Sequence, residues 1–539
     1  MASKQKVAID LASTSPIQKM ALSSKTIAQR DFTSLFSRLP FWLIVLALVL
    51  LALSRFLWLT ADFPIGVSGP GVIYTDEGWW SRNAIAWIRE GDWYIDDGYN
   101  PIVNLPVLPL LQVLWFKIFG IGLSAARGLS AVCTLAISVM VYDFARRELS
   151  PRLALLAPFL ILSSYPTFAF SRLALLEMPM ILLILFSLWF ATLQKARMTT
   201  TLGAAILLAA AALTKTTALF AVPMVLFFIW TRPTLTRSKV THVCIWLLCF
   251  GVLYGAHYIV FVQGYSLSQE SYQYFSNYNV SRKFHRTVFS VLQGPFRTLK
   301  YALPLFPLLL PSLFAALFML TRAKAYRTSF LFRVAALWSI LSLGIFSASN
   351  YAAPRYFLVL IVPIALAIPL AIQQLQAKIM LRERLSRERL LLGRAFHRII
   401  FLGTVYLSIL LSLTRIGLYL QSPNFTFVSM ALSIERYIAQ QPSQSTVILG
   451  HFTDSIALAV PIKGVNDKMG FRPLSERLET FNPGYYLSIG PIEDIGGERE
   501  QLLNQHYTLQ LIETFDAYQY SDYGKPVFFY QLTPRLMLH

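Results

Sequence analysis

Charged residues are scarce in this chain: only 14% of its 539 residues are Asp, Glu, Lys or Arg, while 55% are hydrophobic. A water-soluble fold of this length could not hide so much apolar surface. Apolar runs of about 15–22 residues, near the length that crosses a ~30 Å hydrocarbon core, recur along the sequence. Alternating runs of about ten residues, typical of membrane β-barrels, are absent from the first four-fifths. We therefore expect a polytopic α-helical membrane protein.

Cysteine and histidine are also few, and acidic residues are outnumbered by basic ones. The three cysteines, Cys133, Cys244 and Cys249, all lie in apolar runs, so no disulfide framework or zinc motif follows. The seven histidines are scattered without metal-ligand spacing. The net charge of +20 comes from Lys and Arg in short loops between apolar runs. This is the positive-inside pattern of a membrane protein, and no nucleic-acid partner is expected.

The basic loops set the predicted topology. Residues 1–40 are polar and net basic, so we expect a cytoplasmic tail followed by an uncleaved anchor. The loop 61–124 then lies outside, with an interfacial or re-entrant helix at 104–121. About eleven spans satisfy the positive-inside rule: 41–60, 125–145, 153–171, 178–193, one on each side of Lys215, 240–262, 301–320, 334–348, 356–373 and 399–420.

The stretch 201–230 needs a separate argument. As one helix it would be about 45 Å long, which is too long for one straight span and short for two. A single crossing would turn every later basic loop outward. We therefore split the stretch at Thr214-Lys215-Thr216.

The last part of the chain changes character. In residues 421–539 acidic residues outnumber basic ones, segments 446–449 and 527–530 read as strands, and 429–440 and 498–506 read as helices. We predict three parts: the tail 1–40, a transmembrane domain 41–420, and a C-terminal extracytoplasmic α/β domain 421–539. The C-terminal domain has no Gly-rich phosphate loop and no nucleophile elbow, and the chain has no internal repeat.

Two adjacent acids, Asp76 and Glu77, stand in the first external loop. They precede an amphipathic helical pattern whose apolar face holds Trp80, Ala84, Trp87 and Ile88. One reading is structural: Thr75 caps the helix and the acids complement its dipole. The other is that Asp76 acts at the membrane surface as a general base toward an acceptor hydroxyl.

Further charged residues are predicted on the external side of the membrane. Glu177 begins a helix before Pro179, or faces Asp76 across the bundle, where two carboxylates could bind a divalent metal or an acceptor. Lys215, Arg355 and Arg172 lie beside apolar sequence. They either extend to lipid headgroups or together hold a phosphate.

The external loop 263–300 interleaves aromatic residues with basic ones. It is either a surface loop attracted to anionic lipid or a lid over a lipid-phosphate donor, with His285 as a candidate metal ligand; its basic residues are Arg282, Lys283, Arg286 and Arg297. The spans themselves hold few ionisable groups, which favours chemistry at the outer face over transport through the middle.

These residues resemble the GT-C glycosyltransferases that use polyprenyl-phosphate sugars, in particular the family of dolichyl-phosphate-mannose protein mannosyltransferases and lipid A aminoarabinose transferases. Five segments carry the resemblance, in this order: Tyr74-Thr75-Asp76-Glu77-Gly78; Gly91-Asp92-Trp93 with Pro101, Phe119-Gly120 and Arg127; Ser171-Arg172-Leu173 through Glu177-Met178-Pro179; Leu213-Thr214-Lys215 with Pro223; and Pro354-Arg355-Tyr356-Phe357 with Pro363. They lie within residues 40–420.

The resemblance implies inverting transfer of a sugar from a polyprenyl phosphate to a protein, lipid or polysaccharide acceptor outside the cytoplasm. It implies a catalytic set of Asp76, Glu77 and Glu177, with Asp76 as the base. It places the donor phosphate at Lys215, Arg355, Arg172, Tyr356 and Arg286. The bacterial plasma (inner) membrane is the expected location.

The sequence departs from the aminoarabinose transferases in one segment. Their first loop carries a Glu-Lys-Pro-Pro-like segment, whereas this chain reads Asp96-Asp97-Gly98-Tyr99-Asn100-Pro101, without lysine. A divalent metal therefore stays an open alternative, with Glu177, Asp97 and His285 as its ligands. The alternatives for the whole protein are a lipid or glycan transporter, a lipid-linked oligosaccharide ligase, a phosphoethanolamine-type transferase and a non-catalytic anchor.

Overall fold

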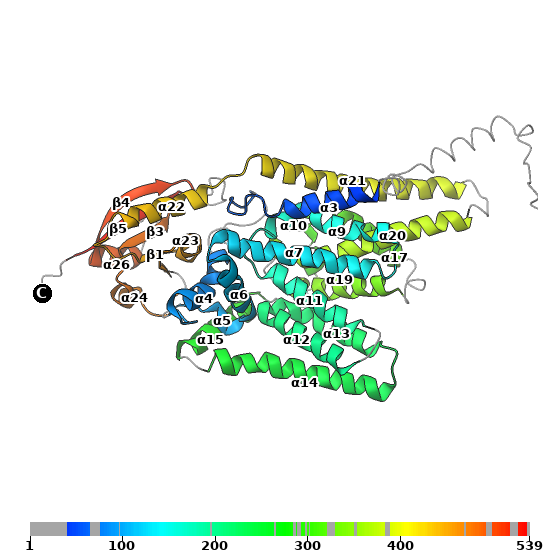
Figure 1. The fold of residues 1–539 in the computed structure, drawn as a ribbon, viewed down its shortest axis with the longest axis horizontal. Helices are drawn as coiled ribbons and strands as arrows, with labels where there is room; N and C mark the ends of the chain where they lie inside the picture. The colour runs from blue at the N-terminus through cyan, green and yellow to red at the C-terminus, as the bar shows by residue number, and fades with distance from the viewer. Residues whose placement is uncertain are drawn as a thin grey trace, which may run out of the picture. The chain divides into compact units, whose positions relative to one another are not determined.

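The computed structural model describes residues 40–64, 76–95, 98–193, 197–263, 266–283, 287, 293–296, 299–300, 302–320, 329–349, 353–382, 389–467, 470–491, 498–517 and 526–535. The chain divides into two compact units, residues 1–50 and 51–539. The first described helix, α3 (Phe41–Leu53), begins in the first unit. All other described helices and strands belong to the second (Figure 1).

Helices make up the described structure of the second unit as far as residue 421. They are α4 (Glu77–Glu90), α5 (Pro101–Asn104), α6 (Val107–Phe119), α7 (Leu123–Ala145), α8 (Pro151–Ala154), α9 (Leu156–Ser163), α10 (Tyr165–Phe170), α11 (Glu177–Ala191), α12 (Met198–Thr214), η3 (Thr216–Phe220), α13 (Ala221–Trp230), α14 (Thr236–Phe261), α15 (Ser266–Lys283), α17 (Leu309–Leu320), α19 (Phe330–Ala348), η4 (Pro354–Leu360), α20 (Ile361–Arg382) and α21 (Arg389–Gln421).

The apolar helices coincide with the predicted spans. Within the described residues, five are long and apolar enough to cross a membrane: Leu123–Ala145, Thr236–Phe261, Phe330–Ala348, Pro354–Leu375 and the stretch Ile399–Ala439. Seven shorter apolar helices include one on each side of Lys215. The helical membrane fold is thus confirmed, while the number of spans stays a prediction. At about 20 Å, α6 is too short to cross, as the interfacial reading of 104–121 requires.

Burial separates the inner helices from the outer ones. Helix α20 packs against α9, α17 and α19, and its apolar residues from Ile361 to Ile372 are almost all buried. Helix α12 packs between α11 and α14, and the outward side of α14 is apolar and exposed. An exposed apolar face on a helix of this length is expected where lipid is the solvent.

One helical segment ends earlier than predicted, and another breaks where predicted. The first span was expected to reach residue 60, but α3 ends at Leu53 and a run of turns follows, with Trp58 at a φ of 54°. Carbonyl groups of this run accept hydrogen bonds from the buried Arg172 and Arg127, which stabilise the turns. Near Lys215 the predicted break is confirmed, because α12 stops at Thr214 and Lys215 is extended (φ −158°, ψ 123°).

The C-terminal part contains the predicted sheet. Its elements are α22 (Thr426–Ala439), β1 (Ile448–Gly450), α23 (Thr453–Ala459), β2 (Gly464–Asn466), α24 (Leu474–Phe481), β3 (Tyr485–Ile489), α26 (Glu498–His506), β4 (Tyr507–Phe515) and β5 (Val527–Pro534). The strand order is β2-β1-β3-β5-β4. Strand β1 is parallel to β2 and β3, while β5 is antiparallel to β3 and β4. The predicted domain boundary at 421 is not tested by this arrangement.

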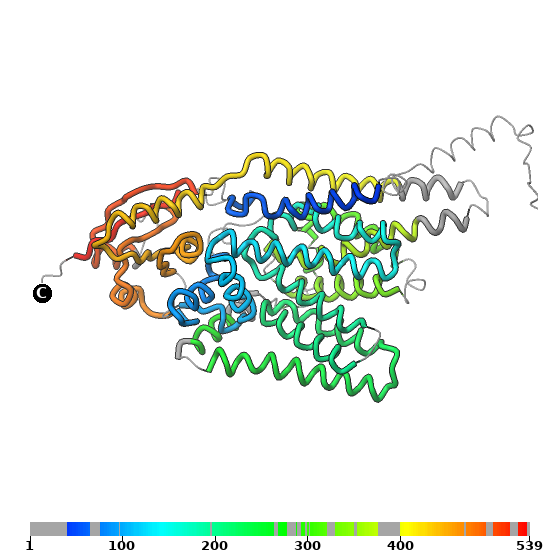
Figure 2. Tube along the Cα trace, in the orientation of Figure 1, coloured from blue at the N-terminus to red at the C-terminus, as the bar shows by residue number. Residues whose placement is uncertain are grey.

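The first loop lies against the C-terminal elements. In Figure 2 the blue segment containing α4 to α6 runs between the helical bundle and the orange and red segments of the sheet. Helix α4 packs on α6 and on α23. Asp62 joins the same regions, because its carboxylate accepts hydrogen bonds from the backbone N–H groups of Thr426 and Phe427 at the start of α22.

Candidate active site

Four charged side chains that are far apart in the sequence converge in the helical bundle. One guanidinium nitrogen of Arg355, Nη2, lies 2.8 Å from Oδ2 of Asp76, and another, Nε, lies 3.4 Å from Oε1 of Glu177. The ammonium group of Lys215 donates a hydrogen bond to the same Glu177 oxygen. The structure thus brings together Asp76, Glu177, Lys215 and Arg355, which the sequence predicted as parts of one site; we call them the ion-pair cluster.

Each member of the ion-pair cluster stands where a helix begins or breaks. Asp76 is the N-cap of α4 and makes no side-chain cap hydrogen bond, and Glu177 is the first residue of α11. The positive ends of these helices favour carboxylates at such positions. Lys215 precedes the 3₁₀ segment η3, and Arg355 is the second residue of η4. Short 3₁₀ stretches inside longer helices often mark functional positions.

The ion-pair cluster is buried and electrically balanced. Each of its four residues is at most 9% exposed. Two carboxylates oppose two cations, so the formal charge of the four sums to zero. Lys215 stands between α12 and η3, outside both helices, and burial lowers the pKa of its ammonium group to about 8, against the opposing effect of the Glu177 carboxylate.

Tyr356 adds an aromatic face to the ion-pair cluster. The ammonium nitrogen of Lys215 lies 3.9 Å from the centroid of the Tyr356 ring, and the guanidinium carbon of Arg355 lies 5.4 Å from it. Both distances are within the range of cation–π attraction. The ring therefore holds both cations on one side while the carboxylates hold them from others.

Glu77 points elsewhere, although it neighbours Asp76. Its two carboxylate oxygens accept hydrogen bonds of 2.8 and 2.6 Å from Arg127 in a bidentate pair. The backbone N–H of Ala174 donates a third, at 2.8 Å. Arg127 also donates to the carbonyl groups of Leu59 and Ala61. The sequence indicates such a pair only through the position of Arg127 inside the predicted span 125–145, where an unpaired charge would be costly.

Arg172 is also placed apart from the ion-pair cluster. Its guanidinium group donates to the carbonyl groups of Ser54, Arg55, Leu57 and Trp58, which form the turns after α3. The same group lies over the Phe168 ring, 5.0 Å from its centroid. These contacts give Arg172 a role in shaping the start of the first loop, rather than one among the clustered cations.

Three predicted site residues, Arg286, Asp97 and His285, lie outside the described residues. Among the residues that are described, no group of three His, Cys, Asp or Glu side chains is arranged to hold a metal ion. The two carboxylates of the ion-pair cluster face Arg355 and Lys215, whose charges would repel a metal cation. The described residues therefore do not fit a divalent metal, and a metal site formed with Asp97 and His285 stays a prediction.

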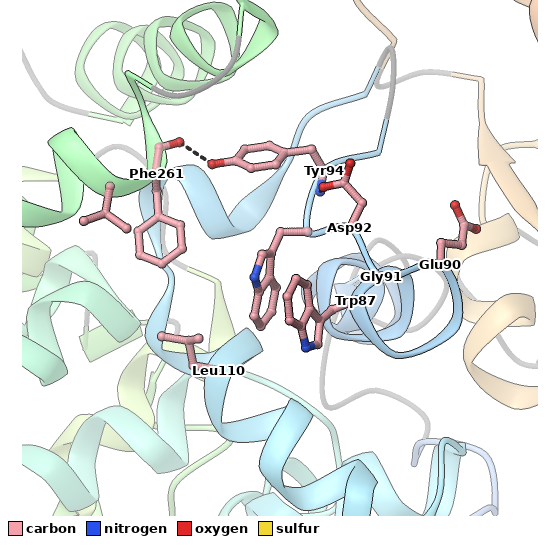
Figure 3. A pocket seen from close by; sticks show the side chains of 9 residues that line it. Trp87, Glu90, Gly91, Asp92, Tyr94, Leu110 and Phe261 are labelled. Atoms are coloured by element: carbon pink, nitrogen blue, oxygen red, sulfur yellow. Dashed lines mark hydrogen bonds between the residues drawn. The ribbon is translucent and has the colours of Figure 1, made fainter.

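A separate pocket opens at the other end of α4. It has a volume of about 620 Å³, and its walls include Trp87, Asp92, Trp93, Tyr94, Leu110 and Phe261 (Figure 3). The Trp87 and Trp93 rings are stacked with centroids 4.6 Å apart, and the Tyr94 hydroxyl donates to the carbonyl group of Phe261. Eleven residues of helix, or about 16 Å, separate Trp87 from Asp76. None of the described lining residues belongs to the ion-pair cluster.

Comparison with known proteins gives one family match and several structural ones. The model of the dolichyl-phosphate-mannose-protein mannosyltransferase family matches residues 101–255, which include Arg127, Glu177 and Lys215. No curated protein gives a significant match to the sequence. The resemblance predicted from the five sequence segments is confirmed by this match and by shared structure.

The structural similarity extends over most of the chain. ArnT from Cupriavidus metallidurans bound to undecaprenyl phosphate is 15% identical, with a TM-score of 0.57 over 90% of this chain and 97% of that one. Its apo form is 16% identical with a TM-score of 0.56 over the same shares. An apo oligosaccharyltransferase from Archaeoglobus fulgidus is 16% identical, with a TM-score of 0.50 over 88% of this chain and 73% of that one. At these identities the similarity establishes the fold.

Proposed function

We propose that this protein is a multi-pass membrane glycosyltransferase that moves a sugar from a polyprenyl-phosphate donor to an acceptor hydroxyl group. The observation that carries the proposal is the buried ion-pair cluster, in which Arg355 joins Asp76 to Glu177 and Glu177 holds Lys215. A carboxylate beside two cations supplies both a base and a phosphate site. The shared fold with ArnT, whose structure contains undecaprenyl phosphate, and the mannosyltransferase family match support the same chemistry.

The proposed reaction is a displacement at the anomeric carbon with inversion. Asp76 takes the proton of the acceptor hydroxyl, and the hydroxyl oxygen forms the new bond to the anomeric carbon. The bond from that carbon to the phosphate oxygen breaks, and its electron pair leaves with the lipid phosphate. Lys215 and Arg355 stabilise the charge that develops there, and Arg286 is retained as a third cation of the donor site.

The ion pairs within the cluster bear on how the base is activated. Arg355 neutralises Asp76 at 2.8 Å, and Lys215 neutralises Glu177. A donor phosphate competes for both cations, so its arrival would loosen the hold of Arg355 on the Asp76 carboxylate. A carboxylate with one partner fewer is a stronger proton acceptor. Donor binding would thus prepare the base before the acceptor enters.

The proposed orientation follows from the basic loops. The N-terminus lies in the cytoplasm, and the first loop, the ion-pair cluster and the C-terminal sheet face the outside of a bacterial plasma membrane. The acceptor is a hydroxyl group of a protein, a lipid or a polysaccharide. A donor whose leaving group is anchored in lipid explains why the cluster is built at the ends of apolar helices.

Turnover of radiolabelled polyprenyl-phosphate sugars by the purified protein in detergent tests this function. A panel of donors is incubated with peptide, lipid and polysaccharide acceptors. The wild type should release polyprenyl phosphate, whereas Asp76→Asn should be slower by about 10²–10⁴-fold, the usual loss for a missing general base. Asp143→Asn is the matched control; Asp143 pairs with Arg146 and Arg147 near the C-terminus of α7, and this variant should turn over like the wild type.

Two other outcomes would count against the proposal. Equal release by wild type and Asp76→Asn would move the base to Glu177. No release from any donor by folded wild-type protein would favour the transporter alternative instead.

A further inference from the structure

The C-terminal part of the chain touches the same helix that carries the proposed base. Helix α4 begins next to Asp76, and its second residue, Gly78, lies against the backbone of α23. A Cβ atom on Gly78 would lie 2.2 Å from the carbonyl carbon of Asp454 and 2.2 Å from the amide nitrogen of Ser455. No side chain fits in that space, so the first turns of the two helices are in direct backbone contact.

A buried ion pair joins the two helices one turn further along. The guanidinium Nε of Arg82 lies 3.7 Å from Oδ1 of Asp454, and the two side chains are 5% and 4% exposed. The second Asp454 oxygen accepts a hydrogen bond of 3.3 Å from the Asn466 amide. Asp454 is thereby fixed from the sheet side while it holds Arg82 on the α4 side.

The surroundings of Arg82 restrict it further. A Cβ atom on Gly98 would lie 2.9 Å from a terminal nitrogen of Arg82, and Gly98 forms an antiparallel bridge with Gly470. Arg477 donates to the carbonyl groups of Asn466 and Asp467 in the segment before Gly470. The guanidinium group of Arg82 is therefore enclosed by backbone and by side chains that are themselves held.

We infer that Asp454 is a positioning residue for the proposed base: by holding Arg82 and the first turn of α4, it sets where Asp76 stands relative to Arg355. Asp76 and Arg82 are six residues apart, or about 9 Å along one helix, so a shift of one moves the other. The inference rests on the proposed function of Asp76. It makes the C-terminal part a component of the catalytic apparatus rather than an appended domain.

Steady-state kinetics of Asp454→Asn separates positioning from folding. A displacement of about 1 Å can cost about 10²-fold in rate, so kcat should fall about 10- to 100-fold while the donor KM stays within about twofold, because Lys215 and Arg355 are untouched. Asp454→Glu should recover part of the loss. Lys463→Gln is the matched control, since Lys463 and Glu90 form an exposed ion pair between the same two regions, 3.5 Å apart; its kcat should equal that of the wild type.

Hydrogen exchange of residues 77–90 gives a second readout that does not need turnover. Exchange should accelerate in Asp454→Asn and stay at the wild-type rate in Lys463→Gln. If Asp454→Asn does not fold, Arg82→Gln/Asp454→Asn replaces it, because the double variant leaves no unpaired buried charge.

Several results would overturn the inference. They are a kcat within twofold of wild type, a donor KM that rises while kcat is unchanged, a loss that only tracks the folded fraction, or unchanged exchange in α4. An inactive wild type would refute the proposed function alone, and the exchange measurement would still decide whether Asp454 holds α4.

Discussion

Replacing Glu77 by Gln, beside Asp76 by Asn, distinguishes the roles of the two adjacent acids in the first loop. Asp76 faces Arg355 in the ion-pair cluster, whereas Glu77 forms a bidentate pair with Arg127. The substitution keeps the shape of the side chain and removes its charge. We expect Glu77→Gln to lower the free energy of unfolding, and Asp76→Asn to lower turnover instead.

The size of the effect follows from the contacts of Arg127. Both Glu77 and Arg127 are 2% exposed, so the glutamine variant leaves a buried guanidinium charge without its carboxylate. Breaking a buried pair in this way costs about 3–5 kcal/mol. The carbonyl groups of Leu59 and Ala61 still accept from Arg127, which favours the lower end, about 3 kcal/mol. That is a large share of a typical total stability of about 5–15 kcal/mol.

Unfolding in mixed detergent, followed by tryptophan fluorescence, measures this difference. Glu90→Gln is the control, because Glu90 is at the other end of α4 and its pair with Lys463 is about half exposed. An exposed pair contributes about 0–1 kcal/mol. Glu77→Gln/Arg127→Met removes the buried charge as well, so it should be more stable than Glu77→Gln.

The reasoning fails if Glu77→Gln is as stable as Glu90→Gln. If Glu77→Gln is stable and has lost as much turnover as Asp76→Asn, Glu77 acts in catalysis. A double variant no more stable than Glu77→Gln would show that the buried charge is not the source of the loss.

Two further predictions concern the cations. Because burial lowers the pKa of Lys215 to about 8, the protonated form is lost as pH rises through that value, and kcat/KM for the donor should fall about tenfold per pH unit above it. Lys215→Arg should move this alkaline limb to higher pH, since a guanidinium group stays charged; an unmoved limb would assign it to another group. Arg172→Leu should destabilise the protein by removing the donor to the carbonyl groups of Ser54, Arg55, Leu57 and Trp58. The donor KM of the remaining folded enzyme should stay within twofold, and a raised KM would return Arg172 to the donor site.

The sequence predicted the fold class and the members of the ion-pair cluster because both depend on long-range regularities. Apolar length and the side preference of Lys and Arg are set by the membrane itself, so they locate the helices without any knowledge of packing. The break at Lys215 followed from parity alone, and the extended backbone there confirms it. The strands at 446–449 and 527–530 were visible from apolar runs, as β1 and β5 show.

Side-chain partners could not be predicted in the same way. Asp76 and Glu77 are chemically similar neighbours, but one is a helix N-cap and the other the first residue of the helix, so their carboxylates point to different arginines. Arg172 is predicted to bind phosphate because it lies beside apolar sequence, like Lys215 and Arg355, and because the resemblance implies it. Its actual partners are backbone carbonyl groups, which carry no sequence signature. The Arg82–Asp454 pair joins residues 372 positions apart in the chain, one in the first loop and one in the C-terminal part, and no local pattern predicted it.

The pairing of Lys215 with Glu177 also bears on how the chain enters the membrane. A lysine without a counter-charge is costly during insertion, by up to about 2.5–3.5 kcal/mol at the centre of a crossing helix, and the cost is smaller at the break between two apolar helices where Lys215 stands. Its counter-charge lies 38 residues earlier, at the start of the helix that precedes α12 and packs beside it. The ribosome therefore delivers the carboxylate before the ammonium group, and the hairpin of α11 and α12 can neutralise its own charge long before Arg355 has been synthesised.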